Sequence, residues 1–418
     1  MEEIPMKYII IGVGSRGSIY GNWAFAHGIE IAAISDIRPD RLKKAAADWN
    51  VTKDRCFTDI NELFALGKIA DAALICTQDR DHYGHVMAAL KCGYDVLLEK
   101  PISPDPKECL DIEQTDKKLG RKVTVCHVLR YTNFWGAIKN VLDSGELGRI
   151  VAIKHSENIG NYHMAHSFVR GNWRNTATSA PIILAKSCHD LDLLLWLTDS
   201  HCTKVSAFGG LSYFKEANAP ANSADRCLDC PVENCRFHSW KVYQPTLGGW
   251  PSDIVCLEQT EDALLEALKT GPYGRCVYKC DNDVCDHMSA AMEFENGITA
   301  TFSLTAQTSA CFRQIYIMCE DGEIEADGRT QQVVIRRHLT HCAETFTERT
   351  INIRTNGSGH GGGDAGIMED FTAVLSSDSG NSRSSISRSV ESHLMAFAIE
   401  KSRLTGTVVD MEEFKHTL

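Results

Sequence analysis

The stretch KYIIIGVGSRG, residues 7–17, determines the fold predicted for the first third of this chain. KYIII (7–11) is a short apolar run of the kind that forms a buried parallel strand. It leads directly into GVGSRG (12–17), a G-x-G-x-x-G pattern whose glycines permit a tight turn and close contact between the backbone and a pyrophosphate. The pattern therefore predicts a phosphate-binding loop at the N-terminus of a helix.

A carboxylate at the expected spacing strengthens this prediction. A second apolar run, IEIAAISD, ends at Asp36, nineteen residues beyond Gly17. An acidic side chain at that position accepts hydrogen bonds from an adenosine ribose, so the two features together predict a dinucleotide site. Asp36 favours NAD over NADP because it repels a 2′-phosphate, although Arg38, two residues later, would tolerate that group.

Apolar runs and helical segments continue to alternate as far as about residue 126. The runs ADAALIC (70–76), YDVLLEKP (94–101) and KVTVCHV (122–128) are separated by helices expected at 82–92 and 105–119. This spacing is typical of a doubly wound parallel sheet, which binds its ligands at the carboxyl ends of the strands. The polar residues at or just beyond those ends are Thr77, Gln78, Glu99, Lys100, His127 and Arg130.

Length, charge and apolar runs restrict the class of protein. The chain has 418 residues, enough for two domains with substantial cores. Its net charge of −12, without a sustained basic run, argues against nucleic acid or an anionic membrane as a partner. The N-terminus resembles neither a signal peptide nor a membrane span, and no apolar run elsewhere reaches spanning length. We therefore expect a cytoplasmic protein whose seventeen cysteines are mostly reduced thiols or metal ligands.

From about residue 127 the pattern changes to strand-like runs, several of which alternate between apolar and polar residues. Short turns such as ENG (295–297) and EDG (320–322) join them and suit hairpins. We expect an antiparallel sheet with one face on helices, near 183–199 and 366–375, and the other face open to a substrate or a partner subunit.

Two further segments complete the expected organisation. A last helix, about 388–404, is expected to pack back near the first domain, and the polar stretch SSDSGNSRSSISRS (376–389) to form a surface loop. The predicted divisions are a dinucleotide-binding domain at 1–126, a substrate and oligomerisation domain at 127–386 containing a cysteine-rich excursion at 211–286, and a C-terminal helix and tail at 387–418.

The motifs of this chain, in their order, strongly resemble those of the Gfo/Idh/MocA family of pyridine-nucleotide oxidoreductases. They are GVGSRG (12–17), Asp36, TQDRDH (77–82), EKP (99–101) and HDLD (189–192). The resemblance implies an α/β Rossmann domain followed by an α+β domain with an open, mostly antiparallel sheet, and activity on sugars, sugar derivatives or inositols. It also implies that Lys100 lies beside the nicotinamide and the substrate hydroxyl, and that His189 is a candidate acid/base.

NAD is the expected cofactor, with NADP less favoured. The residues predicted to contact it are Gly12, Gly14, Ser15, Arg16, Gly17, Asp36, Arg38, Thr77, Gln78, His82, Glu99 and Lys100.

The apolar stretch ILAKSCHDLDLLLWL (183–197) carries the other predicted catalytic residues. On one helix, Lys186 and His189 lie near the same face. Burial and neighbouring cations would lower the pKa of Lys186, as general-base catalysis near neutral pH requires. Many relatives have an aspartate four residues before the histidine, where this chain has Ala185. Three alternatives follow. Lys186 takes the role of that aspartate, Lys100 and His189 share the role, or Lys186 extends to solvent while His189 hydrogen-bonds a neighbour. We predict a catalytic set of Lys100, Lys186 and His189.

Polar and aromatic residues without periodicity indicate a carbohydrate site. Residues 158–174 suit one because aromatic faces stack on C–H bonds while polar groups bind hydroxyls. The glycine-rich run GSGHGGGDAG (357–366) is expected to approach the active site. The predicted substrate contacts are His127, Arg130, Tyr131, His166, Trp173, Arg174, His360 and Asp364, although a structural role fits any one of them as well.

Cys227, Cys230 and Cys235 follow a C-x2-C-x4-C spacing that suits a structural zinc ion. The fourth ligand would be His238, Cys256, Cys276 or Cys280. A metal would stabilise an excursion that has little core of its own. The alternative is a set of free or oxidised thiols, and hydride transfer requires no metal here.

The sequence thus predicts an NAD-dependent oxidoreductase that oxidises a secondary hydroxyl of a sugar, glycoside or inositol. One alternative is an oxidoreductive glycosidase that acts through a transient 3-keto sugar, and another is a dinucleotide-binding sensor without activity, since a fold does not determine function. We expect a small-molecule substrate and a homo-oligomer, either a dimer or a tetramer.

Overall fold

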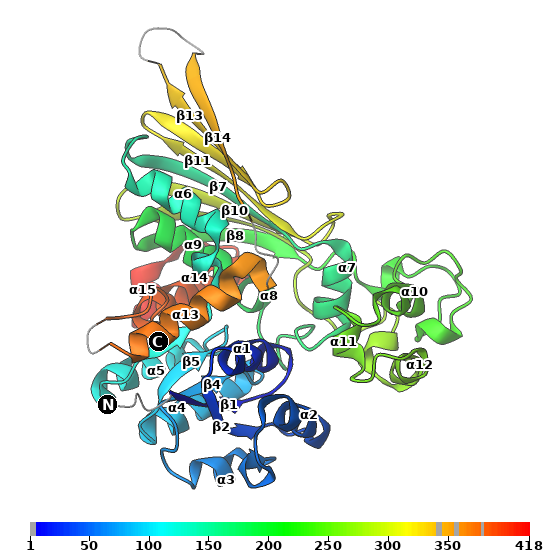
Figure 1. Ribbon diagram of the computed structural model, residues 1–418. Helices are drawn as coiled ribbons and strands as arrows, with labels where there is room; N and C mark the ends of the chain where they lie inside the picture. Colours follow the sequence, from blue (N-terminus) through cyan, green and yellow to red (C-terminus); the bar gives the residue numbers. More distant parts are fainter. Residues whose placement is uncertain (1–5, 340–344, 355–358, 378–379) are drawn as a thin grey trace.

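A computed structural model describes residues 6–339, 345–354, 359–377 and 380–418, which build two sheets with their helices (Figure 1). The first sheet has six parallel strands in the order β3-β2-β1-β4-β5-β6. The strands are β1 (Lys7–Ile11), β2 (Glu30–Ser35), β3 (Cys56–Phe57), β4 (Ala72–Ile75), β5 (Asp95–Leu98) and β6 (Val123–Val125). This order is that of a Rossmann fold, so the predicted fold class of the first domain is confirmed.

Helices cover both faces of this sheet. They are α1 (Ser15–Ala26), α2 (Pro39–Trp49), α3 (Ile60–Phe64), α4 (His82–Lys91) and α5 (Pro106–Leu119). Within β1, Tyr8 and Ile10 face one core while Ile9 and Ile11 face the other. A strand buried on both sides has to be apolar throughout, which is why KYIII predicted it correctly.

The glycine loop joins β1 to α1 through backbone contacts that leave no room for side chains. Gly12 has a φ of +87°, which favours glycine. A Cβ on Gly17 would lie 2.0 Å from the carbonyl oxygen of Gly12, so the start of α1 packs directly on the turn.

The second sheet has nine strands in the order β14-β13-β12-β11-β7-β10-β9-β8-β15. They are β7 (Ile150–Asn158), β8 (Cys202–Gly210), β9 (His287–Phe294), β10 (Thr299–Thr305), β11 (Phe312–Cys319), β12 (Gly322–Asp327), β13 (Gln332–His338), β14 (Phe346–Asn352) and β15 (Val409–Asp410). Only β7 and β10 pair in parallel, so the predicted, mostly antiparallel sheet is confirmed. The ENG and EDG turns connect β9 to β10 and β11 to β12 as expected.

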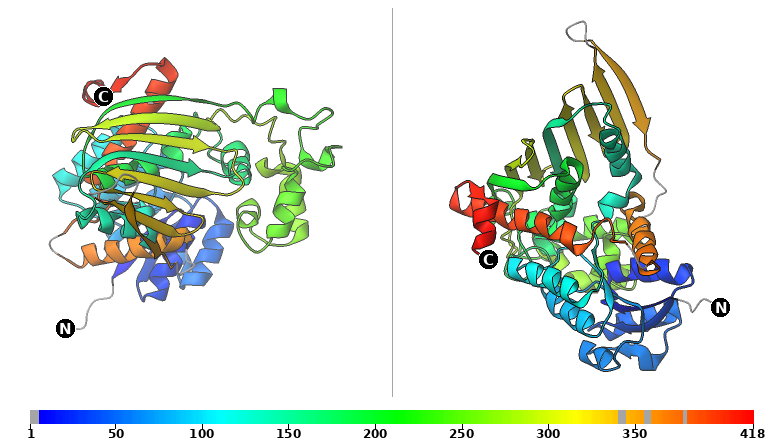
Figure 2. Two further views of the ribbon diagram at one scale, coloured as in Figure 1. Left: turned by 90° about the horizontal axis from the view of Figure 1, so that it is seen from above. Right: turned by 90° about the vertical axis from the view of Figure 1, so that its left-hand side faces the viewer.

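Helices lie along one face of this sheet, and its other face is open (Figure 2). Further helices of the chain are α6 (Asn133–Asp143), α8 (Ile182–Ala185), α9 (Cys188–Thr198), α13 (Gly363–Leu375), α14 (Ile386–Thr405) and α15 (Met411–His416). Strand β9 alternates strictly between exposed and buried residues, as a sheet covered on one side requires. Within the described part of the chain, no helix is long and apolar enough to cross a membrane.

The segment from 211 to 286 projects from the second domain as a small helical insertion, at the right of Figure 1. Its helices are α10 (Ser239–Tyr243), α11 (Ser252–Val255) and α12 (Glu261–Thr270). Before it in sequence, α7 (Asn161–His163) continues into a π-helical stretch, Met164–Arg170. Arg170 is fully buried and donates to the carbonyl oxygens of Arg275 and Phe237, each at 2.7 Å, so it anchors the insertion.

Three predicted details are wrong. Residues 183–199 form two helices, because the chain turns at Lys186 and Ser187 between α8 and α9. Helix α13 packs its apolar residues on the first sheet rather than the second. The described part of the serine-rich stretch is not all surface loop: Ser382 and Ser384 are buried, because the hydroxyl of Tyr131 and the carboxylate of Asp370 hydrogen-bond to them.

The glycine loop generates a test of the first domain. We expect Gly17→Ala to destabilise the protein by about 2 kcal/mol or more, because its methyl group collides with backbone that cannot move away. Gly84→Ala is the matched control, since a Cβ there meets nothing within 4 Å. It should stabilise α4 by about 0.5 kcal/mol. Thermal unfolding of both variants, with and without NAD, measures the effect. Equal stability of the two variants would contradict the described loop.

Candidate active site

The glycine loop presents the backbone N–H groups of α1 to a ligand. Gly14 precedes the helix and no side chain caps it, so the N–H groups of the first turn are available to phosphate oxygens. Asp36, at the end of β2, accepts a hydrogen bond from the backbone N–H of Val13 at 2.9 Å and from that of Arg38 at 2.9 Å. The carboxylate is therefore held beside the loop. A backbone turn with glycine at three of its six positions and free N–H groups fits a dinucleotide.

Arg16 connects this loop to two other segments. Its Nε lies 2.7 Å from Oε1 of Glu99, at the end of β5, and its Nη2 lies 2.6 Å from Oδ1 of Asp364, at the start of α13. Asp364 also contacts Nδ1 of His360 at 3.1 Å, and Glu99 accepts from the hydroxyl of Tyr20 at 2.7 Å. The structure thus brings together four predicted site residues at the carboxyl edge of the sheet.

The charges of this cluster stabilise its carboxylates. Burial raises the pKa of Asp364, but His360 and Arg16 lower it more, and the net pKa is well below the ordinary value. Burial likewise raises the pKa of Glu99, and Arg16 and Lys100 outweigh it, so its net pKa is also below the ordinary value. Both groups are ionised at neutral pH.

Lys100 and His189 meet just beyond this cluster. Nζ of Lys100 donates to the carbonyl oxygen of Ala185 at 3.1 Å. The ring of His189 lies 5.7 Å from that of His127 and 6.4 Å from that of His360, between centroids. Burial, and then Lys100, His127 and other cationic neighbours, lower the pKa of His189 well below its ordinary value. The imidazole is therefore neutral at neutral pH, and its buried Nδ1 has no partner among the described residues.

A carboxylate from β7 lies beside Lys186. Nζ of Lys186 is 3.3 Å from Oε1 of Glu157, whose other oxygen is 2.8 Å from Nη2 of Arg313. Nε of Arg313 is also 2.7 Å from Oδ1 of Asp190, which accepts from His155 at 2.7 Å. Lys186, which lies between α8 and α9, thus pairs with a carboxylate from a neighbouring strand.

Several predicted site residues are engaged elsewhere. Arg130 donates to both oxygens of Asp192, each at 2.7 Å, and to the carbonyl oxygen of Arg383 at 3.0 Å. The hydroxyl of Tyr131 contacts Asp370 at 3.0 Å. These hydrogen bonds hold Arg130 and Tyr131 in structural contacts away from Lys100 and His189.

Other predicted residues contact loops around the site. His82 is buried, with its ring nitrogens near the carbonyl oxygens of Pro101 (2.7 Å) and Thr77 (3.2 Å), so it supports the EKP segment. Nε1 of Trp173 lies 3.4 Å from Oδ1 of Asp79, just beyond Gln78.

Three more of the predicted site residues, His166, Arg174 and Arg38, contact residues away from Lys100 and His189. His166 contacts the hydroxyl of Tyr243 at 3.0 Å, and Arg174 donates to Asp281 at 3.0 Å, both within the insertion. Arg38 pairs with Asp40 at the start of α2, so it does not contact the glycine loop through its guanidinium.

The predicted zinc site is not supported. Within the ranges that the structure describes, no group of three or more His, Cys, Asp or Glu side chains could hold a metal ion. The physical reason lies at Cys227, whose Sγ is 3.2 Å from Nη2 of Arg170. A buried guanidinium occupies the position beside the thiols and would repel a divalent cation. Cys227, Cys230 and Cys235 are free cysteines.

Glu157 and Arg313 were missed in the sequence because they look like ordinary strand residues. The one available signal is their place, since Glu157 is the penultimate residue of β7 and Arg313 the second of β11. These two strand ends are adjacent in the sheet.

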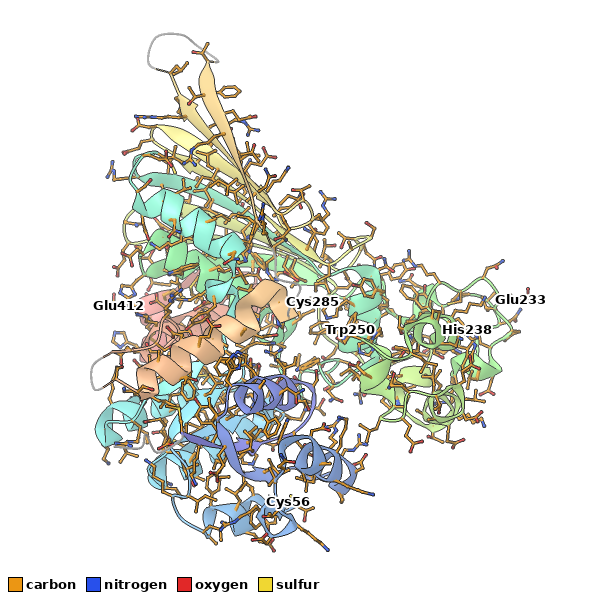
Figure 3. The ribbon with its side chains drawn as sticks, in the orientation of Figure 1. Cys56, Glu233, His238, Trp250, Cys285 and Glu412 are labelled. Atoms are coloured by element: carbon orange, nitrogen blue, oxygen red, sulfur yellow. The ribbon has the colours of Figure 1, made fainter. Side chains whose placement is uncertain are left out.

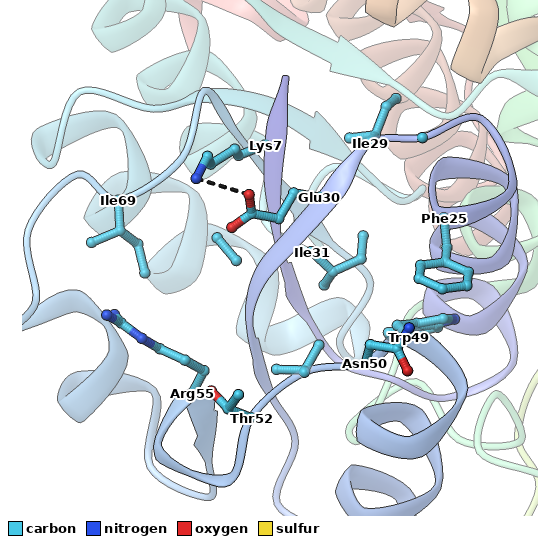
Figure 4. A pocket seen from close by; sticks show the side chains of 13 residues that line it. Lys7, Phe25, Ile29, Glu30, Ile31, Trp49, Asn50, Thr52, Arg55 and Ile69 are labelled. Carbon is cyan, nitrogen blue, oxygen red and sulfur yellow. Dashed lines mark ion pairs between the residues drawn. The ribbon is translucent and has the colours of Figure 1, made fainter. Parts of the chain in front are cut away.

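A pocket of about 530 Å³ on the first domain lies elsewhere (Figure 4). Lys7 and Glu30, which form an ion pair at 2.8 Å, line it at the beginnings of β1 and β2. Parallel sheets bind ligands at the opposite strand ends, so we do not assign this pocket to the site.

Fold and site together define a pyridine-nucleotide oxidoreductase of the Rossmann type. The family model of the Gfo/Idh/MocA oxidoreductases, described as an NAD-binding Rossmann fold, matches residues 6–127, and the model of the GFO/IDH/MocA C-terminal domain matches residues 135–325. The chain belongs to the Gfo/Idh/MocA family.

Individual relatives are distant. The chain is 24% identical over 361 residues to a putative oxidoreductase, YteT, of Bacillus subtilis, covering 83% of each chain. It is 26% identical over 206 residues to an inositol 2-dehydrogenase/D-chiro-inositol 3-dehydrogenase of Lactiplantibacillus plantarum, which is 48% of this chain and 55% of that relative. A crystal structure of an oxidoreductase from Agrobacterium radiobacter with NAD+, L-tartaric acid and magnesium has a TM-score of 0.70 at 16% identity, covering 98% of this chain and 99% of that one.

The partly buried Arg16–Asp364 pair predicts a pH-dependent contribution to stability. We expect Asp364→Asn to lower the free energy of unfolding at pH 7 by about 2 to 3 kcal/mol, because it leaves Arg16 without that partner charge. Since the pKa of Asp364 is below its ordinary value, this difference is complete above about pH 5 and shrinks as the pH falls below 4.

Urea unfolding at several pH values measures this difference. Asp48→Asn, which breaks the exposed Lys44–Asp48 pair, is the control and should change stability by less than about 0.5 kcal/mol throughout. A difference for Asp364→Asn that grows toward acid would contradict the assigned pairing.

Proposed function

We propose that the protein is an NAD-dependent oxidoreductase that oxidises a secondary hydroxyl of a sugar, glycoside or inositol. The observation that carries the proposal is that Lys100, held on the carbonyl oxygen of Ala185, lies near enough for its charge to act on the neutral, buried His189, at the edge of the sheet where the glycine loop lies. An ammonium donor and a neutral imidazole are suited to bind a hydroxyl and move its proton.

Different residues of the protein bind the substrate hydroxyl and accept its proton. NAD+, when bound, supplies the acceptor for the hydride. Lys100 positions the substrate hydroxyl and stabilises the charge that develops on its oxygen as the C–H bond breaks. His189 accepts the hydroxyl proton, because burial and the neighbouring cations keep its ring neutral before reaction. Lys186, which pairs with the buried Glu157, supplies a further donor for neighbouring hydroxyls.

The preference for NAD rests on Asp36. Its carboxylate is held beside the glycine loop by the N–H groups of Val13 and Arg38, and it would repel a 2′-phosphate. The guanidinium of Arg38, which could compensate, is paired with Asp40. The substrate class is supported by the inositol dehydrogenase among the relatives, which shares about half of its length with this chain.

Lys100→Met tests the assignment. We expect the variant to bind NAD as the wild type does but to lose kcat by about 10²–10⁴-fold, because the hydroxyl loses its cationic donor. Lys118→Met, on the exposed side of α5, is the control and should leave kcat unchanged. The assay is a panel of monosaccharides, methyl glycosides and inositols, scored for NADH formation and for glycoside cleavage.

Each outcome of the panel has a separate meaning. Net NADH that depends on Lys100 supports the dehydrogenase. Glycoside cleavage without net NADH indicates an oxidoreductive glycosidase. NAD binding with turnover of the active sugars unaffected by Lys100→Met contradicts the proposed catalytic role.

A further inference from the structure

We propose that Tyr162, His163 and Trp250 form a second sugar-binding subsite beside the candidate active site. The substrate would then be a neutral glycoside of at least two rings, one at Lys100 and the next on this aromatic group. The inference rests on the proposed function and narrows its substrate class.

Trp250 and Tyr162 expose aromatic surface at the junction between the insertion and α7. Trp250 is 44% and Tyr162 40% exposed, and their ring centroids are 5.8 Å apart. The ring of His163 lies 5.2 Å from that of Trp250. Figure 3 shows Trp250 on the side of the insertion toward the rest of the domain, whereas His238 and Glu233 lie farther out. Half-exposed aromatic rings offer apolar faces to sugar C–H groups and polar edges to hydroxyls.

The chain connects this group directly to the candidate active site. Tyr162 lies five residues beyond Glu157, which pairs with Lys186. Between them, Gly160 and Asn161 donate to the hydroxyl and carbonyl oxygens of Thr308 at 3.0 and 2.9 Å. This places the start of α7 against the segment that leads into β11, where Arg313 lies.

The charges that act on His163 also connect the aromatic group with the candidate active site. Burial, followed by the charges of Lys186 and Lys100 among others, lowers the pKa of His163 well below its ordinary value. His163 therefore lies near enough to both lysines for their charges to act on it, while its ring packs against Trp250. A substrate at Lys100 can extend past Lys186 onto the aromatic group.

The charges beside the subsite are balanced, which favours a neutral ligand. Lys186 pairs with Glu157, and Arg313 pairs with Glu157 and Asp190. Two cations thus face two carboxylates, and the further cation, Lys100, lies at the position of the reacting ring rather than of the second ring.

The insertion holds Trp250 in place. His166, in the π-helical stretch, contacts the hydroxyl of Tyr243 at 3.0 Å and stacks on Tyr273 with centroids 4.8 Å apart. Its ring also lies 5.4 Å from that of Trp250. π-helical segments often occur at functional sites, and this one gives the insertion a defined position next to α7.

Saturation-transfer NMR and steady-state kinetics test the subsite in the full-length protein with NAD. The probes are glucose, galactose and N-acetylglucosamine, compared with cellobiose, lactose and chitobiose. We expect the second ring of at least one disaccharide to receive saturation in the wild type. In Trp250→Ala we expect that signal and kcat/KM for the disaccharide to fall about tenfold, with the monosaccharide unchanged.

Two further variants complete the design. Tyr162→Ala removes the other ring without touching the insertion, so it tests the subsite even if Trp250→Ala fails to fold. Phe25→Ala, a similarly exposed aromatic residue on α1, is the control and should change neither quantity.

The outcomes separate the subsite from the proposed function. If a monosaccharide is oxidised but no disaccharide responds to either aromatic variant, the subsite is wrong and the proposed function stands. If a disaccharide binds through Trp250 but no probe is oxidised, the subsite stands and the proposed function is wrong. If the protein binds the acidic disaccharide digalacturonate in preference to every neutral disaccharide, the proposal of a neutral substrate is wrong. If no probe binds, the subsite is wrong, and the proposed function is decided by the panel that includes inositols.

Discussion

The geometry of the site depends on the ion pairs that the guanidinium of Arg16 makes with two carboxylates. It belongs to the glycine loop, and its partners Glu99 and Asp364 come from the end of β5 and the start of α13. One side chain therefore fixes the phosphate-binding loop, the residue before Lys100 and the glycine-rich loop of His360 relative to one another. Two buried carboxylates that share one partly buried cation are stable only as a complete set, because removing the cation leaves their charges unpaired in the interior.

Much of the fold was predictable because its signals are local. In the parallel sheet each strand is an apolar run, and the glycine pattern marks the turn that follows β1. The placement of α13 was not predictable, since its periodicity shows that one face is buried but not on which sheet. The serine-rich stretch was misjudged for a related reason. Ser382 is buried because Asp370, twelve residues earlier, accepts its hydrogen bond, and composition does not reveal such a partner.

The site was predicted where residues follow a strand end or a motif, as Lys100 and His189 do. Prediction failed where the partner lies across the sheet. Glu157 and Arg313 meet because β7 and β11 are neighbours in a particular register. Arg130 looked like a substrate contact because it follows a strand end, but Asp192 from α9 binds it at both oxygens. The cysteine spacing suggested a metal, and only the fold shows that Arg170 lies among the thiols.

The central claim is that a sugar or polyol loses a hydride to NAD at the Lys100–His189 cluster. The most direct measurement uses glucose, galactose and myo-inositol deuterated at every carbon, incubated with the protein and NAD, followed by mass spectrometry and NMR of the dinucleotide. The account predicts that the dinucleotide reduced by an active substrate carries one deuterium at C4 of the nicotinamide. Consumption of a substrate with no deuterium reaching the dinucleotide, bound or released, would contradict it.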